Sequence, residues 1–445
     1  MNINYEFETI SAIATPLGMG GVGVIRISGD NAFEIAKKMF SKKTIEAGKI
    51  HHGWVIDEGK KIDEVVLLPF KNPNSYTGED IIEIQCHGGP KVIKKILDLT
   101  IKNGARLAQR GEFTKRAFLN KKLDLSQAEA VLDIIHAKTS NFAQKSANNL
   151  SGMLAEKIKE IKSSLFTLYS RIIAAVDFPE DVAEPQYSHL EEKIKQNIEN
   201  INQILKNANA SNIMRQGIKI AIAGCPNAGK SSLFNALLNL ERAIVTDIPG
   251  TTRDIIQETL DIDGIPATLI DTAGIRDNEG IDKVEAIGIE YTKNCVENAD
   301  LILFLFDWSK GFDANDALIY ELIENKPHIK IATKSDLAEV PNPEAINISS
   351  KTGHNIEELK EKIKEAVLDK NTLESEFVTN QRQEECLKHA KVALENALVA
   401  TNNGELQDLI SIDIKTALMS LDEITGEVIT DEILENIFEH FCIGK

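Results

Sequence analysis

The fold of this chain is decided by the stretch Gly224-Cys225-Pro226-Asn227-Ala228-Gly229-Lys230-Ser231, which Ser232 follows. It fits the phosphate-loop pattern G-x-x-x-x-G-K-[ST] at every fixed position. An apolar run suited to a buried strand, residues 218–223, precedes it, and residues 232–238 can open a helix. Because backbone N–H groups at a helix N-terminus point at an anion, this order predicts a phosphate site. Lys230 would reach the terminal phosphates, and the Ser231 hydroxyl would bind Mg²⁺.

Three further segments follow in an order that identifies the nucleotide. The first is a polar loop, residues 243–254, which could supply a threonine to Mg²⁺. The second is a strand that ends in Asp271-Thr272-Ala273-Gly274, whose aspartate can support Mg²⁺ through water. In the third, Thr333-Lys334-Ser335-Asp336, the carboxylate of Asp336 could accept guanine N–H groups while Lys334 lies along the base. Together with alternating apolar strands and helices, the four segments predict a guanine-specific GTPase in a doubly wound α/β domain.

Two positions depart from the commonest GTPase pattern. The base-reading motif N-K-x-D normally begins with Asn, and here Thr333 stands first. We expect this threonine to hydrogen-bond to the loop and guanine preference to persist. Small Ras-like GTPases orient the attacking water with a glutamine directly after D-x-x-G, where this chain has Ile275. Another group must therefore position the water. An arginine finger, or a monovalent cation enclosed by Asn227 and the polar loop, must offset the growing phosphoryl charge.

Length and composition restrict the class of protein. The 445 residues suggest roughly three domains. The net charge of −18 argues against nonspecific coating of nucleic acid, but leaves room for a local basic patch that holds a structured RNA. The five cysteines are scattered without a C-x-x-C pair, which predicts a reducing compartment without a zinc site or disulfides. The chain start has no signal-peptide pattern and the longest apolar run, residues 301–306, is short, so we expect a cytosolic protein without membrane contact.

Residues 1–118 mix short strands with helices, and apolar side chains at helical spacing predict a helix over 91–102. Residues 18–23 formally match the dinucleotide pattern G-x-G-x-x-G, which requires a following helix. Because the strand-like run 24–27 follows, a glycine turn between strands is the preferred interpretation. His87 has no Cys or His nearby, so we interpret it as a loop or packing residue and not as a metal ligand.

From residue 119 the pattern becomes helical. The motif Ser126-Gln127-Ala128-Glu129 predicts a capping box at a helix start. Two apolar stripes with steps of three and four predict the core of a helix bundle. The first consists of Ile158, Ile161, Leu165, Leu168 and Ile172, and the second of Ile194, Ile198, Ile201 and Leu205. The helical pattern resumes at about residue 380. The predicted fold is an α+β N-terminal domain over 1–118, an all-α helical domain in two parts, 119–216 and 371–445, and an inserted α/β (P-loop, Ras-like) GTPase domain over 217–370.

Further motifs connect the chain to a known family. They include Gly20-Gly21-Val22-Gly23-Val24-Ile25-Arg26, Tyr76-Thr77-Gly78-Glu79-Asp80, His87-Gly88-Gly89-Pro90, Arg110-Gly111-Glu112-Phe113-Thr114, Lys122-Leu123-Asp124-Leu125, Ile248-Pro249-Gly250-Thr251-Thr252-Arg253-Asp254 and the terminal Cys442-Ile443-Gly444-Lys445. Related GTPases share the nucleotide motifs, whereas the N-terminal and terminal motifs are specific. Through them the chain resembles the MnmE (TrmE) family of bacterial tRNA modification GTPases along essentially its full length.

The resemblance implies a cytosolic homodimer with an N-terminal folate-binding and dimerisation domain. It implies that the enzyme works with the flavoprotein MnmG, which holds FAD, in a heterotetramer. The product would be an aminomethyl or carboxymethylaminomethyl group at carbon 5 of the wobble uridine of certain tRNAs. A tetrahydrofolate derivative would supply the one-carbon unit. GTP hydrolysis would require Mg²⁺, with K⁺ in the arginine-finger role once two GTPase domains approach each other.

The motifs and the resemblance also assign individual residues. The predicted GTP contacts are Gly224, Asn227, Ala228, Gly229, Lys230, Ser231, Ser232, Thr246, Asp247, Ile248, Pro249, Gly250, Thr251, Thr252, Asp271, Thr272, Ala273, Gly274, Lys334 and Asp336. The implied Mg²⁺ ligands are Ser231 and Thr252, and the implied K⁺ ligands are Asn227, Thr246, Ile248 and Thr251. The implied folate contacts are Arg26, Glu83, Lys122 and Lys445. The implied catalytic residues are Lys230 and Glu285, with Glu285 positioning the water. Cys442 is either chemically active or a packed thiol.

Two other functions stay open at this point. A GTPase switch for ribosome assembly would share the phosphate loop, but no dedicated RNA-binding module is recognisable in the sequence, and the terminal motif has no role there. A structural scaffold with a decayed GTPase domain is the second alternative. The intact Lys230, Ser231, Asp271 and Asp336 argue against it.

Overall fold

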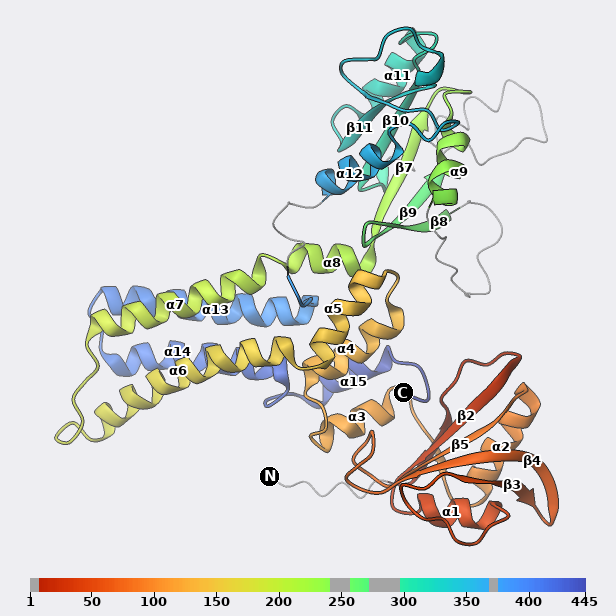
Figure 1. The fold of residues 1–445 in the computed structure, drawn as a ribbon. Coiled ribbons are helices and arrows are strands. Elements are labelled where there is room, and N and C mark those ends of the chain that lie inside the picture. Colours follow the sequence, from red (N-terminus) through yellow and green to blue (C-terminus); the bar gives the residue numbers. More distant parts are fainter. Residues whose placement is uncertain (1–7, 241–256, 272–296, 368–374) are drawn as a thin grey trace. The chain divides into compact units, whose positions relative to one another are not determined.

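The computed structural model describes residues 8–240, 257–271, 297–367 and 375–445 (Figure 1). The chain forms two compact units. One contains Met1–Leu132 with Leu421–Lys445, and the other contains Asp133–Ser420. Each unit has its own six-stranded sheet.

The first unit is built on a mostly antiparallel sheet with the strand order β3-β4-β5-β2-β1-β6. Its strands are β1 (Ile10–Ile13), β2 (Gly20–Ser28), β3 (His51–Asp57), β4 (Lys60–Phe70), β5 (Ile81–Gly88) and β6 (Arg106–Leu107). The glycine-rich stretch 18–23 leads directly into β2, which pairs with β1. The glycines are thus followed by a strand and not by a helix, but the predicted turn is correct only for residues 18–19, because 20–23 already belong to β2.

Two helices, α1 (Ala32–Met39) and α2 (Pro90–Lys102), cover one face of this sheet (Figure 1). The predicted helix over 91–102 is thus confirmed. Side chains alternate between the faces of a strand, so Ile25 and Ile27 of β2 enter the core beneath these helices. Arg26, between them, belongs to the opposite face, where its register partner on β5 is Glu83.

The opposite face carries α3 (Glu112–Leu119) and the C-terminal tail, which follows α15 (Asp431–Glu439). The tail is tied to α3 because the N–H of Phe113 donates to the carbonyl of Lys445 at 3.2 Å. Gly444 has φ +100°, and a Cβ there would lie 2.1 Å from the carbonyl oxygen of Ile13. Only glycine allows the tail to approach β1 this closely.

A buried ion network holds α3 to the rest of the first unit. Arg116 is only 1% exposed and donates to the Glu79 carboxylate at 3.1–3.2 Å, to Glu112 at 2.8 Å and to the carbonyl of Glu8 at 2.9 Å. Burial by itself would raise the pKa of Glu112, but hydrogen bonds from Arg106, Arg116 and a backbone N–H lower it to about 2. Glu112 is therefore a carboxylate at neutral pH, and the network stays charged inside the unit.

The helix α4 (Leu125–His136) begins at a capping box, but not at the predicted one. The Asp124 carboxylate accepts from the N–H of Gln127 at 3.0 Å, and the Gln127 side chain accepts from the N–H of Asp124 at 2.9 Å. The box predicted at 126–129 is therefore wrong by two residues. The Ser126 hydroxyl instead donates to Asp124 at 2.6 Å, because the aspartate already occupies the capping position.

The second unit contains a helical part and an α/β part. The helices of the helical part are α5 (Ser140–Leu150), α6 (Met153–Asp177), α7 (Tyr187–Leu205), α8 (Ala208–Gln216), α13 (Gln381–Asn402) and α14 (Gln407–Thr425), whose last turn belongs to the first unit. The helix α7 packs against both α6 and α13 (Figure 1). All five residues of the first predicted stripe are buried in α6, which confirms that stripe as bundle core.

The second predicted stripe is wrong at two positions. The buried seam of α7 consists of Leu190, Ile194, Asn197, Ile201 and Ile204, whereas Ile198 and Leu205 are half-buried. The amide of Asn197 occupies the seam because its Nδ2 donates to the Ser164 hydroxyl of α6 at 3.0 Å. Because the buried seam contains this polar residue, the spacing of apolar residues alone did not predict which face of α7 is buried.

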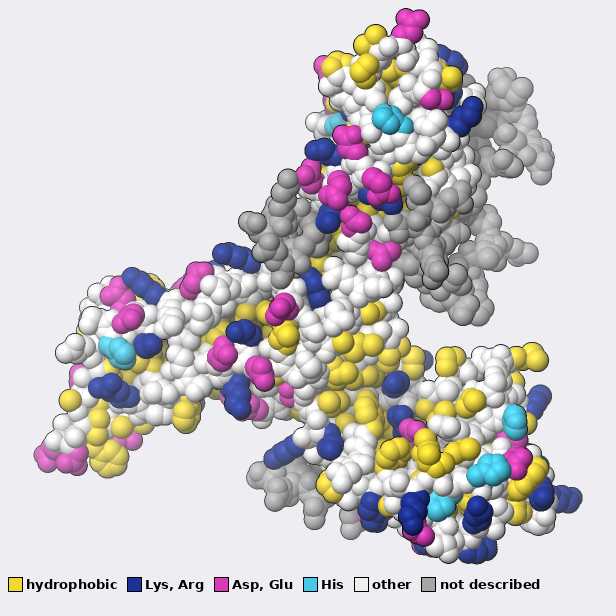
Figure 2. All heavy atoms as spheres, in the orientation of Figure 1, with side chains coloured by type: hydrophobic (Ala, Val, Ile, Leu, Met, Phe, Trp, Pro, Cys, Tyr) yellow, Lys and Arg dark blue, Asp and Glu magenta, His cyan; other side chains and the backbone are white. Residues whose placement is uncertain are grey.

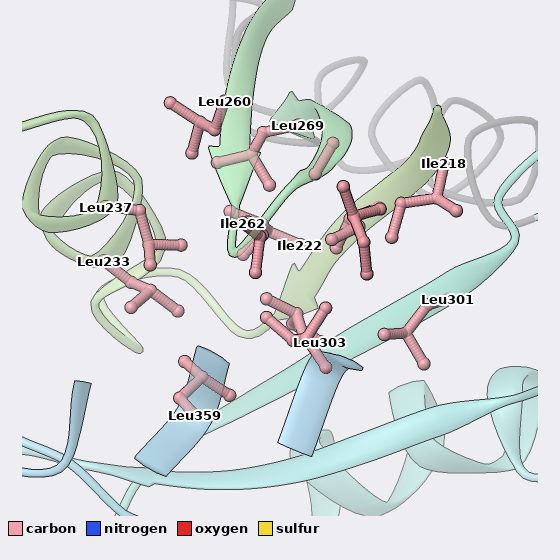
Figure 3. Packing of buried hydrophobic residues seen from close by; sticks show 14 of the residues in the cluster. Ile218, Ile222, Leu233, Leu237, Leu260, Ile262, Leu269, Leu301, Leu303 and Leu359 are labelled. Atoms are coloured by element: carbon pink, nitrogen blue, oxygen red, sulfur yellow. The ribbon is translucent and has the colours of Figure 1, made fainter. Parts of the chain in front are cut away.

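The α/β part has the strand order β12-β11-β10-β7-β9-β8, with every neighbouring pair parallel except β8 and β9. Its strands are β7 (Ile218–Gly224), β8 (Gln257–Ile262), β9 (Ile265–Asp271), β10 (Leu301–Asp307), β11 (His328–Thr333) and β12 (Ile346–Asn347), and its helices are α9 (Lys230–Leu240), α11 (Ala314–Ile323) and α12 (Ile356–Val367). In the core, Leu233 and Leu237 of α9 face Ile222, Leu260 and Leu269 (Figure 3). The predicted α/β class of this part is confirmed.

The two parts of the second unit share one core. Phe142 of α5, Met214 of α8 and Val378 belong to the same buried cluster as the strands of the α/β sheet. Among the described residues, no helix is long and apolar enough to cross a membrane.

Candidate functional site

The phosphate loop connects the carboxyl end of β7 to α9, as predicted. The strand β7 lies between β9 and β10, so the strand order reverses here, and ligands of α/β sheets bind at such a point. Gly224 approaches β10 so closely that a Cβ would lie 2.2 Å from the carbonyl oxygen of Leu305. A larger residue would displace the loop from the end of its strand.

Within the loop, the ammonium of Lys230 is held by main-chain oxygens. Its Nζ lies 2.8 Å from the Gly224 carbonyl and 3.0 Å from the Cys225 carbonyl. The positive charge is therefore placed over the loop where a phosphate would sit. Asn227 is exposed with φ +65°, a left-handed conformation that asparagine tolerates better than most residues. Ser231 is exposed in the first turn of α9, and its hydroxyl is a hard oxygen ligand suited to Mg²⁺.

Thr333 replaces the usual Asn of the base-reading motif and makes the expected bond to the loop. Its hydroxyl is buried and lies 2.8 Å from the carbonyl of Ala228 and 3.0 Å from the carbonyl of Phe306. The threonine therefore links the end of β11 to the phosphate loop and to β10. The hydroxyl performs the bridging that the amide of asparagine would otherwise provide.

The lysine and aspartate of this motif follow in a short 3-10 turn, Ser335–Leu337. Lys334 has φ +57°, and its Nζ lies 2.6 Å from the carboxylate of Asp307. Burial alone would raise the pKa of Asp307, but hydrogen bonds from Lys334 and Ser309 outweigh it and lower that pKa. Asp307 thus stays charged and holds the ammonium group of Lys334 in place. Asp336 is exposed and accessible to a base.

Replacing Thr333 by valine, which has nearly the same shape, is expected to weaken GDP and GTP binding roughly tenfold. The change leaves the Ala228 carbonyl without this donor, and such a loss costs about 1–3 kcal/mol. Titration with a fluorescent guanine nucleotide measures the affinity. Ser335→Ala, two residues along, serves as the comparison. Unchanged affinity in Thr333→Val would show that the bridge to the loop does not support the nucleotide site.

Several predicted site residues cannot be placed. Thr246, Asp247, Ile248, Pro249, Gly250, Thr251, Thr252, Thr272, Ala273, Gly274 and Glu285 lie outside the described residues. The backbone of Asp271 is the last of β9 and pairs with Ile222 of β7, next to the phosphate loop. The sequence prediction missed Asp307. Its position directly after the apolar run 301–306, in the strand before the base-reading motif, could have indicated it.

The first unit contains a separate pocket of about 340 Å³. It is lined by Phe70, Asn74, Ser75, Tyr76, Ile81, Glu83 and Lys122. Two of the four residues predicted to bind folate, Glu83 and Lys122, thus line one pocket. The Nζ of Lys122 lies 3.1 Å from the carbonyl of Pro73, at the loop that borders it. The pocket therefore presents one acidic and one basic side chain beside aromatic and apolar ones.

The other two predicted residues are close to this pocket. Arg26 donates to Glu83 at 2.8 Å, and its guanidinium lies 5.3 Å from the ring centre of Tyr76 and 5.5 Å from that of Phe113. One of its terminal nitrogens, Nη1, is buried without a hydrogen-bond partner in the described structure. Burial, followed by the charge of Arg26, lowers the pKa of the Lys445 amine, so this amine is also near. The sequence prediction missed Tyr76 and Phe113 as parts of the arrangement.

A third cluster lies beside the phosphate loop. The side chains of Cys225, Asp313 and Asp316 bring one sulfur and two carboxylates within 4.8 Å of one another. Burial, and then a hydrogen bond to Asp316, raises the pKa of the Cys225 thiol to about 12. The thiol therefore stays protonated, which disfavours both nucleophilic and metal-ligand roles. The two aspartates form the capping box of α11, which gives them a structural role.

The α/β fold, the phosphate loop and the base-reading turn define a GTPase domain, joined in this chain to helices and to a separate α+β domain. Family models described as "GTP-binding protein TrmE N-terminus" and "MnmE helical domain" match residues 9–122 and 125–442. The chain belongs to the MnmE family of tRNA modification GTPases. It is thus an enzyme that binds and hydrolyses GTP and acts in tRNA modification.

Individual relatives agree with this. The tRNA modification GTPase MnmE of Caldicellulosiruptor saccharolyticus is 45% identical over 99% of this chain and 100% of its own length. That of Clostridioides difficile is 42% identical over 98% of this chain and 99% of its own length. Among solved structures, the G domain of the FeoB iron transporter of T. maritima is 32% identical over 34% of this chain and 99% of that chain, with a TM-score of 0.26. The family assignment rests on the full-length relatives.

Proposed function

We propose that this enzyme, together with the flavoprotein MnmG, adds an aminomethyl or carboxymethylaminomethyl group to carbon 5 of the wobble uridine of certain tRNAs. The observation that carries the proposal is that the chain has a second pocket in addition to its nucleotide site. That pocket combines the carboxylate of Glu83 with the ammonium of Lys122. A GTPase that only switched between two states would not need it, whereas a group-transfer enzyme needs a place for the group donor.

A tetrahydrofolate derivative is the proposed donor. Its pterin ring presents N–H donors, which the Glu83 carboxylate can accept, and a flat face, which Tyr76 can contact. Its glutamate tail carries carboxylates, which Lys122 and the unpartnered Nη1 of Arg26 can bind. Burial and the charge of Arg26 lower the pKa of the nearby Lys445 amine. The residues present therefore fit the chemistry of this ligand.

At the nucleotide site we propose Mg²⁺ on Ser231 and Thr252, and K⁺ on Asn227, Thr246, Ile248 and Thr251. The exposed amide of Asn227, held in a left-handed turn, is suited to present an oxygen to a monovalent cation. Glu285 is proposed to position the attacking water, since Ile275 cannot. The cation then supplies the charge compensation that an arginine finger supplies in other GTPases, once two copies of the chain associate as a homodimer.

A reconstituted reaction with one component omitted at a time tests these proposals together. The purified protein, the flavoprotein, tRNA lacking the modification, GTP, Mg²⁺, K⁺, a reduced folate and a nitrogen donor (ammonium for the aminomethyl group, glycine for the carboxymethylaminomethyl group) are combined. The tRNA nucleosides are then analysed by mass spectrometry. We expect the 5-substituted uridine in the complete mixture only. If it forms without the folate, the second pocket does not hold the donor. If it forms equally well in Na⁺, the cation proposal is wrong.

The corresponding test in cells separates the modification from the alternative of ribosome assembly. Deleting the gene should remove the 5-substituted wobble uridines from bulk tRNA, and the intact gene should restore them. A copy with Lys230→Ala should not, because the nucleotide site is then disabled. Modified uridines that persist without the gene would contradict the proposed function.

A further inference from the structure

The charge of this chain is distributed unevenly along the sequence. Residues 9–122, the N-terminal domain, contain 19 Lys and Arg against 12 Asp and Glu, a net charge of +7. The rest of the chain contains 31 Lys and Arg against 56 Asp and Glu, a net charge of −25. The overall charge of −18 therefore conceals a basic domain. Such an asymmetry is the electrostatic footprint of a partner that is an anion.

Part of this positive charge lies on the helices that cover one face of the first sheet. Lys38 lies on α1, and Lys91, Lys94 and Lys95 lie in the first two turns of α2, all four of them exposed. Within the described part of the chain, none of the four takes part in an ion pair. Figure 2 shows Lys and Arg side chains gathered over the lower edge of the first unit, where Figure 1 labels α1. We call these four residues the α1–α2 lysine face.

One of these lysines, Lys91, occupies a position that is unfavourable for the helix itself. The N-terminal end of a helix carries a partial positive charge, which favours acidic residues in the first turn. The first turn of α2 has no acidic residue, and Gly89 at its N-cap offers no capping side chain. Instead, Lys91 places a cation in this turn, and Lys94 and Lys95 follow in the second turn. Lys91 thus opposes helix stability, and all three lysines are exposed, which indicates that they serve an interaction.

We propose that the α1–α2 lysine face binds the phosphate backbone of the tRNA substrate. The inference depends on the proposed function only in taking tRNA as the substrate. Lysine ammonium groups bind phosphates as point charges on flexible stems and do not read bases. The face lies on the side of the sheet opposite the second pocket, because Ile25 and Arg26 alternate along β2. The lysines thus hold and orient the tRNA, and other groups contact the base that is modified.

The test compares two triple variants of the full-length protein that lose the same charge. One is Lys91→Gln, Lys94→Gln, Lys95→Gln on α2. The control is Lys159→Gln, Lys195→Gln, Lys415→Gln, three exposed lysines of the acidic second unit. Fluorescence anisotropy with labelled tRNA measures affinity between about 50 and 200 mM KCl, a range over which phosphate contacts have a steep salt dependence. GTP hydrolysis and thermal unfolding confirm that both variants fold.

We expect the α2 variant to bind tRNA roughly tenfold to a hundredfold more weakly. The slope of log affinity against log salt should become shallower by about two to three, close to one for each phosphate contact. The control should match the parent protein. A second variant, Lys94→Glu with Lys95→Glu, should weaken binding further by repulsion.

Three results would overturn the proposal. The first is equal affinity and slope in the α2 variant and the parent protein. The second is equal weakening in the control, which would mean that only total charge matters. The third is unchanged tRNA binding with lost binding of the flavoprotein, which would assign the face to a protein partner. Because the readout is direct RNA binding, a failure of the wobble-uridine proposal leaves this test intact.

Discussion

Replacing Lys230 by alanine is expected to lower the rate of GTP hydrolysis by about 10²–10³-fold, the usual cost of removing one group that stabilises transition-state charge. In the structure its ammonium is held over the phosphate loop by the carbonyls of Gly224 and Cys225. No other described lysine or arginine shares this position in the loop. Release of inorganic phosphate at saturating GTP measures the rate. The control is Lys219→Ala, an exposed lysine on β7 that precedes the loop.

A companion variant separates the role of the Lys230 ammonium from that of the proposed K⁺ ion. Asn227→Ala should remove the advantage of KCl over NaCl in hydrolysis while leaving nucleotide binding nearly unchanged. Lys230→Ala should be slow in both salts, because it removes the fixed charge and not the bound ion. A Lys230→Ala enzyme with a nearly normal rate would mean that another cation stabilises the phosphates. An unchanged salt preference in Asn227→Ala would remove this residue from the K⁺ site.

Replacing Arg116 by methionine is expected to destabilise the first unit by about 3–5 kcal/mol. Methionine fills much of the volume, but the carboxylates of Glu79 and Glu112 are then buried without their shared cation. Urea unfolding can be followed through Trp54 of β3 in a Trp308→Phe background, so that the single tryptophan reports on the first unit. Arg110→Met, an exposed arginine beside α3, is the control and should cost far less.

The same network predicts an acid dependence. The pKa of Glu112 is lowered to about 2 in the folded chain, against an ordinary value of 4.5. A group with a lowered folded pKa stabilises the fold above its unfolded pKa, and this contribution is lost as pH falls from about 4.5 towards 2. The parent protein should therefore lose stability of the first unit over that range. In Arg116→Met the loss should be smaller, because the pKa of Glu112 is then closer to its ordinary value. An equal loss in both proteins would place the acid sensitivity elsewhere.

Local pattern was sufficient to locate the phosphate loop. The glycines of the phosphate loop, the apolar strand before it and the helix after it all follow from short-range backbone requirements. For that reason 224–231 was placed correctly between β7 and α9. Thr333 was also predicted to bond to the loop, since only a hydroxyl at that point was needed. The predicted stripe of α6 is confirmed, because all its members are apolar and buried.

Two of the misses have a common physical origin, which is competition between neighbouring residues. Asp124 caps α4 in place of Ser126, because its carboxylate already accepts from the free N–H of Gln127 and from the Ser126 hydroxyl. In α7 the amide of Asn197 takes a core position because α6 offers it a hydroxyl partner. Asp307 is a different kind of miss: it meets Lys334 because β10 and β11 pair in parallel and place Asp307 opposite Thr333.

The sequence by itself determined the order of the elements, the phosphate loop, the base-reading turn and the family, because each depends on residues that are close together in the chain. Only the tertiary structure decided which distant side chains meet. Arg26 and Glu83 are 57 residues apart and become partners through the register of β2 and β5. Lys445 joins them because a glycine without a side chain lets the tail approach β1. Such meetings depend on strand register and close packing, which are properties of the whole fold and not of any local stretch.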